Sequence, residues 1–283
     1  MAYSTLITPT ELYPHLNDPN WVVVDCRFNL MDTEAGRRTY RTGHIPGARY
    51  AHLDEDLSGP ITPASGRHPL PDSARLMATF SAWGIHATSQ VVAYDEANGA
   101  IAARLWWLLR WLGHRAVAVL DGGLSGWRHE HLPLSTEIPT PQTSSFQGCP
   151  DNRLWIDSAE MLDRVGKGDA LIVDARAVVR YRGEQEPIDP VAGHVPGAIN
   201  LPLEGNLNPA GQFLPPAALR ERFAAVLRGR PPTELIHMCG SGVTACHNLL
   251  AMEAVGLSGS RLYAGSWSEW IRDLARPVAM GAE

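Results

Sequence analysis

The chain has 283 residues, with 24 Lys and Arg against 30 Asp and Glu and a formal net charge of −6. Its basic residues are scattered along the chain, which argues against a nucleic-acid partner. The N-terminus lacks the basic and apolar regions of a signal peptide, and the most apolar helical segment, 101–113, is too short to span a membrane, so we expect a soluble, cytoplasmic protein.

The first half of the chain alternates short apolar runs with helical patterns. Runs rich in β-branched residues at 21–24, 90–94 and 116–120 predict strands, and 100–112 predicts a helix. Fully apolar strands of this kind are typical of a parallel sheet covered by helices on both faces. The segment 131–152 that follows is rich in Pro, Ser and Thr, which indicates an extended linker.

The second half repeats this order, with strands expected at 170–173, 234–237 and 260–263 and a helix at 244–255. VVVDCR followed by GHIPGARY recurs as LIVDAR followed by GHVPGAIN at nearly the same spacing, and VLDGGLSGW matches LYAGSWSEW. We therefore predict an α/β fold in two tandem domains, each a parallel sheet flanked by helices. The predicted ranges are a first domain at 1–140, a linker at 141–152 and a second domain at 153–283.

The four cysteines, Cys26, Cys149, Cys239 and Cys246, have no CxxC spacing. This pattern fits neither a disulfide framework nor a zinc site, so we expect reduced thiols and neither a metal nor a cofactor. Cys246 lies seven residues after Cys239 and is expected to be a buried helix residue. A redox partnership between these two cysteines is the alternative.

Cys239 is the cysteine with a candidate function, because it follows a predicted strand and precedes a loop and a helix. Parallel sheets bind ligands at the carboxyl ends of their strands. The loop residues are Gly240, Ser241, Gly242, Val243 and Thr244. Two glycines permit a tight turn whose N–H groups converge on the sulfur, and such an environment lowers a thiol pKa from its usual value of about 8.5. We therefore expect a reactive thiolate.

The alternative is that Cys239 is a small buried hydrophobic residue that closes its strand. The repeat argues against this, because the matching residue in the first half is Asp95. A core thiol would hardly be exchanged for a carboxylate, whereas a loop site with a charged side chain would tolerate the exchange. The same comparison predicts that only the second domain is active.

The chain resembles the two-domain rhodanese family, of the 3-mercaptopyruvate sulfurtransferase type. The resemblance rests on the tandem VDxR and GHIPGA segments, the CGSGVTA loop, LDGG in the first half and YAGSWSEW in the second. The resemblance covers nearly the whole chain. It implies a catalytically silent first domain and a second domain whose Cys239 takes sulfane sulfur from 3-mercaptopyruvate as a persulfide. The sulfur then passes to a thiol acceptor such as thioredoxin, or to cyanide.

The resemblance also implies roles for individual residues. Ser241 matches a loop serine that stands where thiosulfate-type enzymes carry a lysine, and Asp54 and His68 match the residues that complete a proton relay with it. A surface histidine and a solvated acidic loop are the alternative for the latter two, and Asp56 lies two residues from Asp54. The loop residues Gly240, Gly242, Val243 and Thr244 are expected to contact the substrate.

Arg180 matches the family arginine that binds the substrate carboxylate. A second arginine expected after EP is replaced by Ile188, for which Arg182 could compensate. Three alternative functions follow. Thiosulfate could be the donor, or the chain could be a protein persulfide carrier. A cysteine phosphatase is the third, but it needs an arginine six positions after the cysteine, where this sequence has Ala245.

Overall fold

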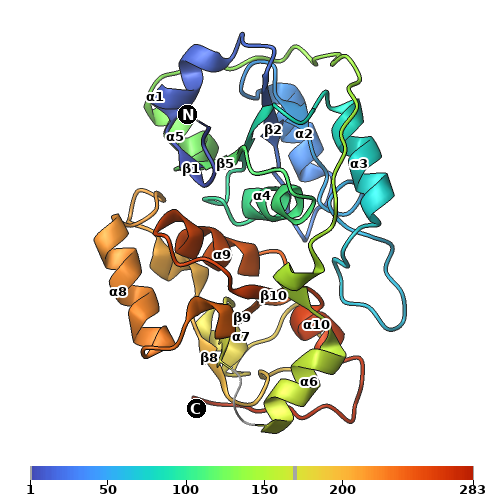
Figure 1. The fold of residues 1–283 in the computed structure, drawn as a ribbon, viewed down its shortest axis with the longest axis vertical. Helices are drawn as coiled ribbons and strands as arrows, with labels where there is room; N and C mark the ends of the chain where they lie inside the picture. Colours follow the sequence, from blue (N-terminus) through green and yellow to red (C-terminus); the bar gives the residue numbers. More distant parts are fainter. Residues whose placement is uncertain (1, 168–170, 283) are drawn as a thin grey trace. The chain divides into compact units, whose positions relative to one another are not determined.

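The computed structural model describes residues 2–167 and 171–282, and these form two compact units (Figure 1). The first unit comprises the described parts of Met1–Gly59, Leu70–Asp151 and Asn208–Phe213. The second comprises those of Pro60–Pro69, Asn152–Leu207 and Leu214–Glu283. The expected domain ends Met1 and Glu283, and Ala170 of an expected strand, lie outside the described residues.

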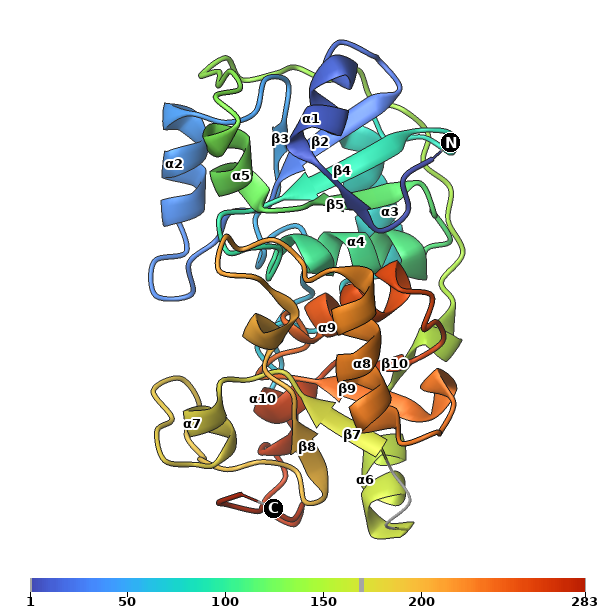
Figure 2. The ribbon, with the colours of Figure 1, turned by 90° about the vertical axis from the view of Figure 1, so that its left-hand side faces the viewer.

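The first unit is built on a parallel five-stranded sheet with the order β1-β5-β4-β2-β3. Its strands are β1 (Leu6–Ile7), β2 (Trp21–Asp25), β3 (Arg49–Tyr50), β4 (Gln90–Tyr94) and β5 (Val117–Leu120). Its α-helices are α1 (Pro9–Leu12), α2 (Ala35–Thr42), α3 (Ser73–Ala82), α4 (Ala102–Trp111) and α5 (Gly123–His129), with a 3₁₀ turn at Tyr13–His15. Helices α2 and α5 cover one face of the sheet, and α3 and α4 cover the other (Figure 2).

The second unit repeats this topology with the order β6-β10-β9-β7-β8, again parallel throughout. Its strands are β6 (Trp155–Ile156), β7 (Leu171–Asp174), β8 (Ala198–Asn200), β9 (Leu235–Met238) and β10 (Arg261–Tyr263). Its α-helices are α6 (Ser158–Lys167), α7 (Val178–Tyr181), α8 (Pro216–Leu227), α9 (Ala245–Ala254) and α10 (Ser266–Trp270). Short 3₁₀ turns lie at Asn152–Leu154, Leu203–Asn206 and Pro232–Glu234. Raising each strand number of the first order by five gives the second, so the duplication seen in the sequence is a duplication of fold.

The repeated VDxR and GH segments are structural in both units. Arg27 Nη2 lies 2.6 Å from Asp25 Oδ2 and donates to the Gly43 carbonyl oxygen at 2.8 Å. Arg176 does the same in the second unit, at 2.7 Å from Asp174 Oδ2 and 2.8 Å from the oxygen of Gly193. A buried ion pair with its remaining hydrogen bonds satisfied fixes a strand end to the next loop, which explains why both copies keep the motif.

The long predicted elements agree with the structure within one or two residues, whereas the shortest strands were not predicted. The strand expected at 234–237 is β9, and the helix expected at 244–255 is α9. The predicted linker contains no α-helix or strand, and its last residue, Asn152, begins a 3₁₀ turn. The Ser144 N–H donates to the Ser81 carbonyl oxygen at 2.9 Å, so the linker packs along the first unit. No helix in the described part of the chain is long and apolar enough to cross a membrane.

Candidate active site

Cys239 is the first residue after β9, and its side chain is buried, with 1% of the residue exposed. The Gly242 N–H donates to Cys239 Sγ at 3.2 Å, so the loop turns back on the sulfur. Gly242 has φ of +77°, and a Cβ there would lie 2.1 Å from the Ala264 carbonyl oxygen. Only glycine fits this position, because other residues rarely adopt that backbone conformation and a side chain would collide with the neighbouring loop.

Helix α10 holds the cysteine loop through its backbone N–H groups and the Ser266 hydroxyl oxygen. Ser266 Oγ accepts from the Cys239 N–H at 3.1 Å, and the Trp267 N–H donates to the Cys239 carbonyl oxygen at 3.0 Å. The Ser268 N–H donates to the oxygen of Gly240 at 2.8 Å. These bonds fix both sides of the cysteine, so the YAGSWSEW segment serves as the support of the loop.

Ser241 and His68 are in hydrogen-bonding contact in the second unit. His68 Nδ1 lies 2.7 Å from Ser241 Oγ, and both residues are more than nine-tenths buried. The segment 60–69 comes close to α10 because Gly66 has no side chain: a Cβ there would lie 2.6 Å from the Gly265 carbonyl oxygen and 2.8 Å from Ser268 Oγ. The structure thus joins two residues that the sequence placed in different halves of the chain.

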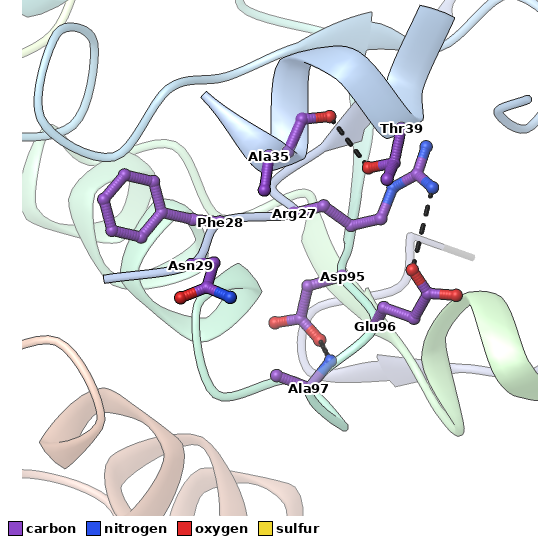
Figure 3. A pocket seen from close by; sticks show the side chains of 9 residues that line it. Arg27, Phe28, Asn29, Ala35, Thr39, Asp95, Glu96 and Ala97 are labelled. Carbon is purple, nitrogen blue, oxygen red and sulfur yellow. Dashed lines mark hydrogen bonds and ion pairs between the residues drawn. The ribbon is translucent and has the colours of Figure 1, made fainter. Parts of the chain in front are cut away.

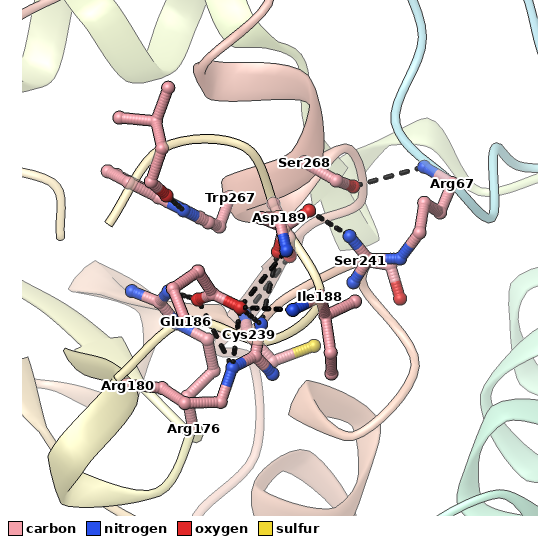
Figure 4. Close-up of polar contacts among 12 residues, drawn as sticks. Arg67, Arg176, Arg180, Glu186, Ile188, Asp189, Cys239, Ser241, Trp267 and Ser268 are labelled. Carbon is pink, nitrogen blue, oxygen red and sulfur yellow. Dashed lines mark hydrogen bonds and ion pairs between the residues drawn. The ribbon is translucent and has the colours of Figure 1, made fainter. Parts of the chain in front are cut away.

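Arg180 lies beside the cysteine loop together with Arg67 (Figure 4). A Cβ on Gly240 would lie 3.0 Å from Arg67 Nη2 and 3.6 Å from Arg180 Nη1. Asp189 bridges the two arginines, with Oδ1 paired to Arg67 Nη1 and Oδ2 at 3.1 Å from Arg180 Nη2. The sequence reasoning missed Arg67 and Asp189. The signal available was the basic residue next to His68 in GRHPLP.

A third arginine, Arg176, supports this cluster from the end of β7. Its guanidinium lies over the Trp267 ring at 4.8 Å and pairs with Asp174 and, at 3.4 Å, with Glu186. Burial lowers the pKa of Arg176, but the Asp174 and Glu186 carboxylates outweigh burial and raise it. Burial likewise raises the pKa of Glu186, and its hydrogen bonds to Arg180 and backbone N–H groups more than reverse this, so the pKa is lowered. The surroundings therefore favour the ionised forms of Arg176 and Glu186, whereas burial raises the pKa of Asp189.

Three other residues considered in the sequence analysis, Asp54, Asp56 and Arg182, each contact a residue close to them in the chain. Asp54 is exposed in the first unit, where its N–H donates to His52 Nδ1 at 3.2 Å, and its place in a relay stays a prediction. Asp56 Oδ2 accepts from the His52 N–H at 2.7 Å, so it belongs to that turn. The Arg182 side chain is 43% exposed and lies 3.7 Å from Glu184, and its compensation for Ile188 stays a prediction.

The remaining loop residues, Val243 and Thr244, lead from the cysteine loop into α9. Val243 is buried, and Thr244 is the N-cap of α9, although its side chain makes no capping hydrogen bond within the described residues. In the first turn of α9, the Cys246 N–H donates to the Val243 carbonyl oxygen and the His247 N–H to the Thr244 carbonyl oxygen, each at 3.1 Å. Cys246 is a buried residue of α9 whose thiol donates to the Gly242 carbonyl oxygen at 3.4 Å, as expected for a helix residue.

The matching loop of the first unit shows what this geometry can hold. The Asp95 carboxylate, buried to 1% exposure, accepts four backbone hydrogen bonds of 2.8 Å each, from Ala97, Gly99, Ile101 and Ala102. Burial raises the pKa of Asp95, and the four N–H groups oppose that rise. Figure 3 shows the residue at the edge of a cavity of about 200 Å³ that Arg27 and Glu96 also line. The loop after the equivalent strand therefore directs four backbone N–H groups at one buried carboxyl group.

Residues 8–130 and 157–273 both match the family described as Rhodanese-like domain. The chain belongs to the rhodanese family. The two matched ranges contain all strands of the two sheets except β1 and β6, so the resemblance and the α/β fold of tandem rhodanese-like domains predicted from the sequence are confirmed. Which rhodanese domain is silent and which is catalytic, and the boundary at 141–152, stay predictions.

Relatives of this rhodanese are similar over almost its whole length. A protein of Pseudomonas aeruginosa named probable 3-mercaptopyruvate sulfurtransferase is 51% identical over 283 residues, covering 99% of this chain and 100% of the relative. A putative thiosulfate sulfurtransferase SseB of Mycobacterium tuberculosis is 37% identical, covering 98% and 97%. The solved structure of 3-mercaptopyruvate sulfurtransferase from Leishmania major superimposes with a TM-score of 0.84 at 30% identity, covering 97% of this chain and 75% of that one.

Proposed function

We propose that this rhodanese is a sulfurtransferase that takes sulfur from 3-mercaptopyruvate on Cys239. The Cys239 thiolate attacks the donor sulfur and forms the S–S bond of a persulfide. The C–S bond breaks, and its electron pair leaves with the three-carbon fragment as pyruvate enolate, which takes up one proton. The carbon is reduced and the sulfur oxidised within this step, so no further oxidant or reductant is needed. A thiol such as thioredoxin, or cyanide, then removes the outer sulfur.

The anion-holding loop supports a persulfide at Cys239. In the first unit, the equivalent loop directs four N–H groups at the Asp95 carboxylate. In the second unit one N–H, that of Gly242, donates to Cys239 Sγ. A persulfide adds a second sulfur and carries its charge farther out, toward the N-terminus of α9, where backbone N–H groups and the helix dipole favour negative charge.

The contact between Ser241 and His68 is the main observation that supports 3-mercaptopyruvate, rather than thiosulfate, as the donor. Pyruvate enolate needs a proton as it leaves, and a hydroxyl 2.7 Å from an imidazole nitrogen can supply one. Sulfite, the fragment released from thiosulfate, leaves without one. The residues 239–244 also contain no lysine or arginine that would bind a doubly charged donor.

Donor comparison tests the proposed function directly. We expect kcat/KM for 3-mercaptopyruvate to exceed that for thiosulfate with the same acceptor, because the loop supplies a proton source and no cation. The comparison uses steady-state rates of pyruvate and of sulfite release. A higher kcat/KM for thiosulfate would assign the chain to the thiosulfate sulfurtransferases. Persulfide formation without turnover of either donor would instead indicate a persulfide carrier.

Replacing His68 with alanine is expected to lower kcat for 3-mercaptopyruvate by about 10²-fold, since proton transfer by a positioned side chain contributes about that much or more. The loss with thiosulfate should be several-fold smaller, because sulfite needs no proton. The control is His86→Ala. His86 is a partly exposed histidine of the first unit, and it hydrogen-bonds to Thr88 rather than to the cysteine loop. Equal losses on both donors would show that His68 only supports the loop.

A further inference from the structure

The second unit contains two guanidinium groups at the residue after the reactive cysteine. A Cβ on Gly240 would lie 3.0 Å from Arg67 Nη2 and 3.6 Å from Arg180 Nη1, although the chain has Ile188 where a second binding arginine was expected. The backbone of Arg67 is fixed there, because its N–H donates to Ser268 Oγ at 3.0 Å. Ser268 in turn binds the oxygen of Gly240. The position of Arg67 is thus tied to the cysteine loop itself.

Arg67 also has hydrogen-bonding capacity that the folded chain does not use. Its Nε is buried and has no hydrogen-bond partner among the described residues, while Nη1 pairs with Asp189. A buried guanidinium nitrogen without a partner costs free energy unless a ligand satisfies it. Arg180, in contrast, is already engaged through Nε and Nη2 by Glu186.

We propose that Arg67 is the second carboxylate-binding arginine of this enzyme and acts with Arg180 on the carboxylate of the sulfur donor. Asp189 holds the two guanidinium groups side by side through its two oxygens, and is a positioning residue. The inference rests on the proposed function, because it assigns the site a 2-oxo acid as donor. It also explains how a chain with Ile188 at the expected position retains two arginines at the loop.

The charge of the cluster favours a singly charged donor. Arg67, Arg176 and Arg180 are paired with three carboxylates, those of Asp174, Glu186 and Asp189. The described side chains of the cluster are therefore balanced before a donor binds. One added carboxylate can use the free hydrogen-bonding positions of the arginines, whereas the second charge of a dianion would meet Asp189 and Glu186 without a further cation.

The test compares two donors that differ only in the carboxylate: 3-mercaptopyruvate and mercaptoacetone, in which a methyl group replaces it. In Arg67→Gln we expect KM for 3-mercaptopyruvate to rise about 10-fold with kcat changed less than 3-fold, because one charge-assisted contact is lost before the chemical step. The rate with mercaptoacetone should stay within 2-fold of wild type. Competitive inhibition by pyruvate should weaken by a similar factor of about 10, and Arg67→Lys should fall between the two.

Arg272→Gln is the matched control, because Arg272 Nε donates to the Ser65 carbonyl oxygen at 3.2 Å and so also ties the segment 60–69 to the unit. The Arg272→Gln variant should have the same KM and kcat as the wild type with both donors. The role of Arg67 would be wrong if Arg67→Gln lowered activity equally with both donors, or if it left KM for 3-mercaptopyruvate and inhibition by pyruvate unchanged. In either case, turnover of 3-mercaptopyruvate by the wild type would still support the proposed function. Failure of the wild type to turn over 3-mercaptopyruvate would overturn the proposed function itself.

Discussion

Cys239→Ser is expected to lower sulfur transfer by about 10⁴-fold or more, the scale seen when a covalent nucleophile is removed. Serine preserves the shape of the buried side chain and can accept the Gly242 N–H, but its hydroxyl cannot form the S–S bond on which the proposed reaction depends. Intact mass after incubation with the donor measures the first half-reaction directly. The wild type should gain one sulfur, and the variant none.

Cys246→Ser is the control for this experiment. Cys246 lies on the same helix-loop element, is equally buried, and donates its S–H to the Gly242 carbonyl oxygen at 3.4 Å, a bond that a serine hydroxyl can replace. Its activity and added sulfur should stay close to those of the wild type. If Cys239→Ser still acquires the sulfur and Cys246→Ser does not, the nucleophile has been assigned to the wrong cysteine.

Gly242→Ala is expected to reduce kcat/KM by about 10²–10³-fold, comparable to the loss of one preorganised donor in other active sites. The new Cβ would lie 2.1 Å from the Ala264 carbonyl oxygen, so the loop has to move and the bond from the Gly242 N–H to Sγ is lost. The positive φ of +77° adds strain of about 1–3 kcal/mol. Steady-state kinetics and the rate of persulfide formation measure the effect.

Gly256→Ala separates strain from the loss of the sulfur contact. Gly256 has φ of +79° in the same unit, and a Cβ there has no neighbour within 4 Å among the described residues. It should lower the midpoint of thermal unfolding by an amount set by the backbone conformation alone and leave kcat/KM nearly unchanged. A Gly242→Ala enzyme as active as the Gly256→Ala enzyme would mean that the loop N–H contributes nothing to the reaction.

The fold was largely predictable because the hydrophobic pattern of the sequence is periodic and its motifs occur twice. Buried strands such as β4 and β9 are continuous apolar runs, and the recurrence of VDxR and GH segments identified two copies before any contact was known. The edge strands β1, β3, β6 and β8 were missed because runs of two or three residues carry no period. The packing of 131–152 along the first unit was also missed, since it depends on single hydrogen bonds from an irregular backbone.

The candidate site was predictable where local pattern and family resemblance coincided, and not elsewhere. Cys239 and Ser241 are neighbours in a recognisable loop, and the resemblance added His68, whose contact with Ser241 the structure shows. Their chemical roles stay predictions. Arg67 was missed because its partner Ser268 is 201 residues away, and no periodic signal links positions at that distance. Pairings of this kind are fixed by tertiary structure alone.

The assignment of 60–69 to the second unit has a consequence for how the duplicated chain could have evolved. The first copy carries Asp95 where the second carries Cys239, yet it also encodes His68 and Arg67, which belong to the compact unit of the other copy. After a gene duplication, a half that lost its nucleophile could be discarded only if the remaining half were self-sufficient. If the first copy is the silent one, as predicted, its loss would also remove residues 60–69 from the second compact unit, so both copies would be retained together.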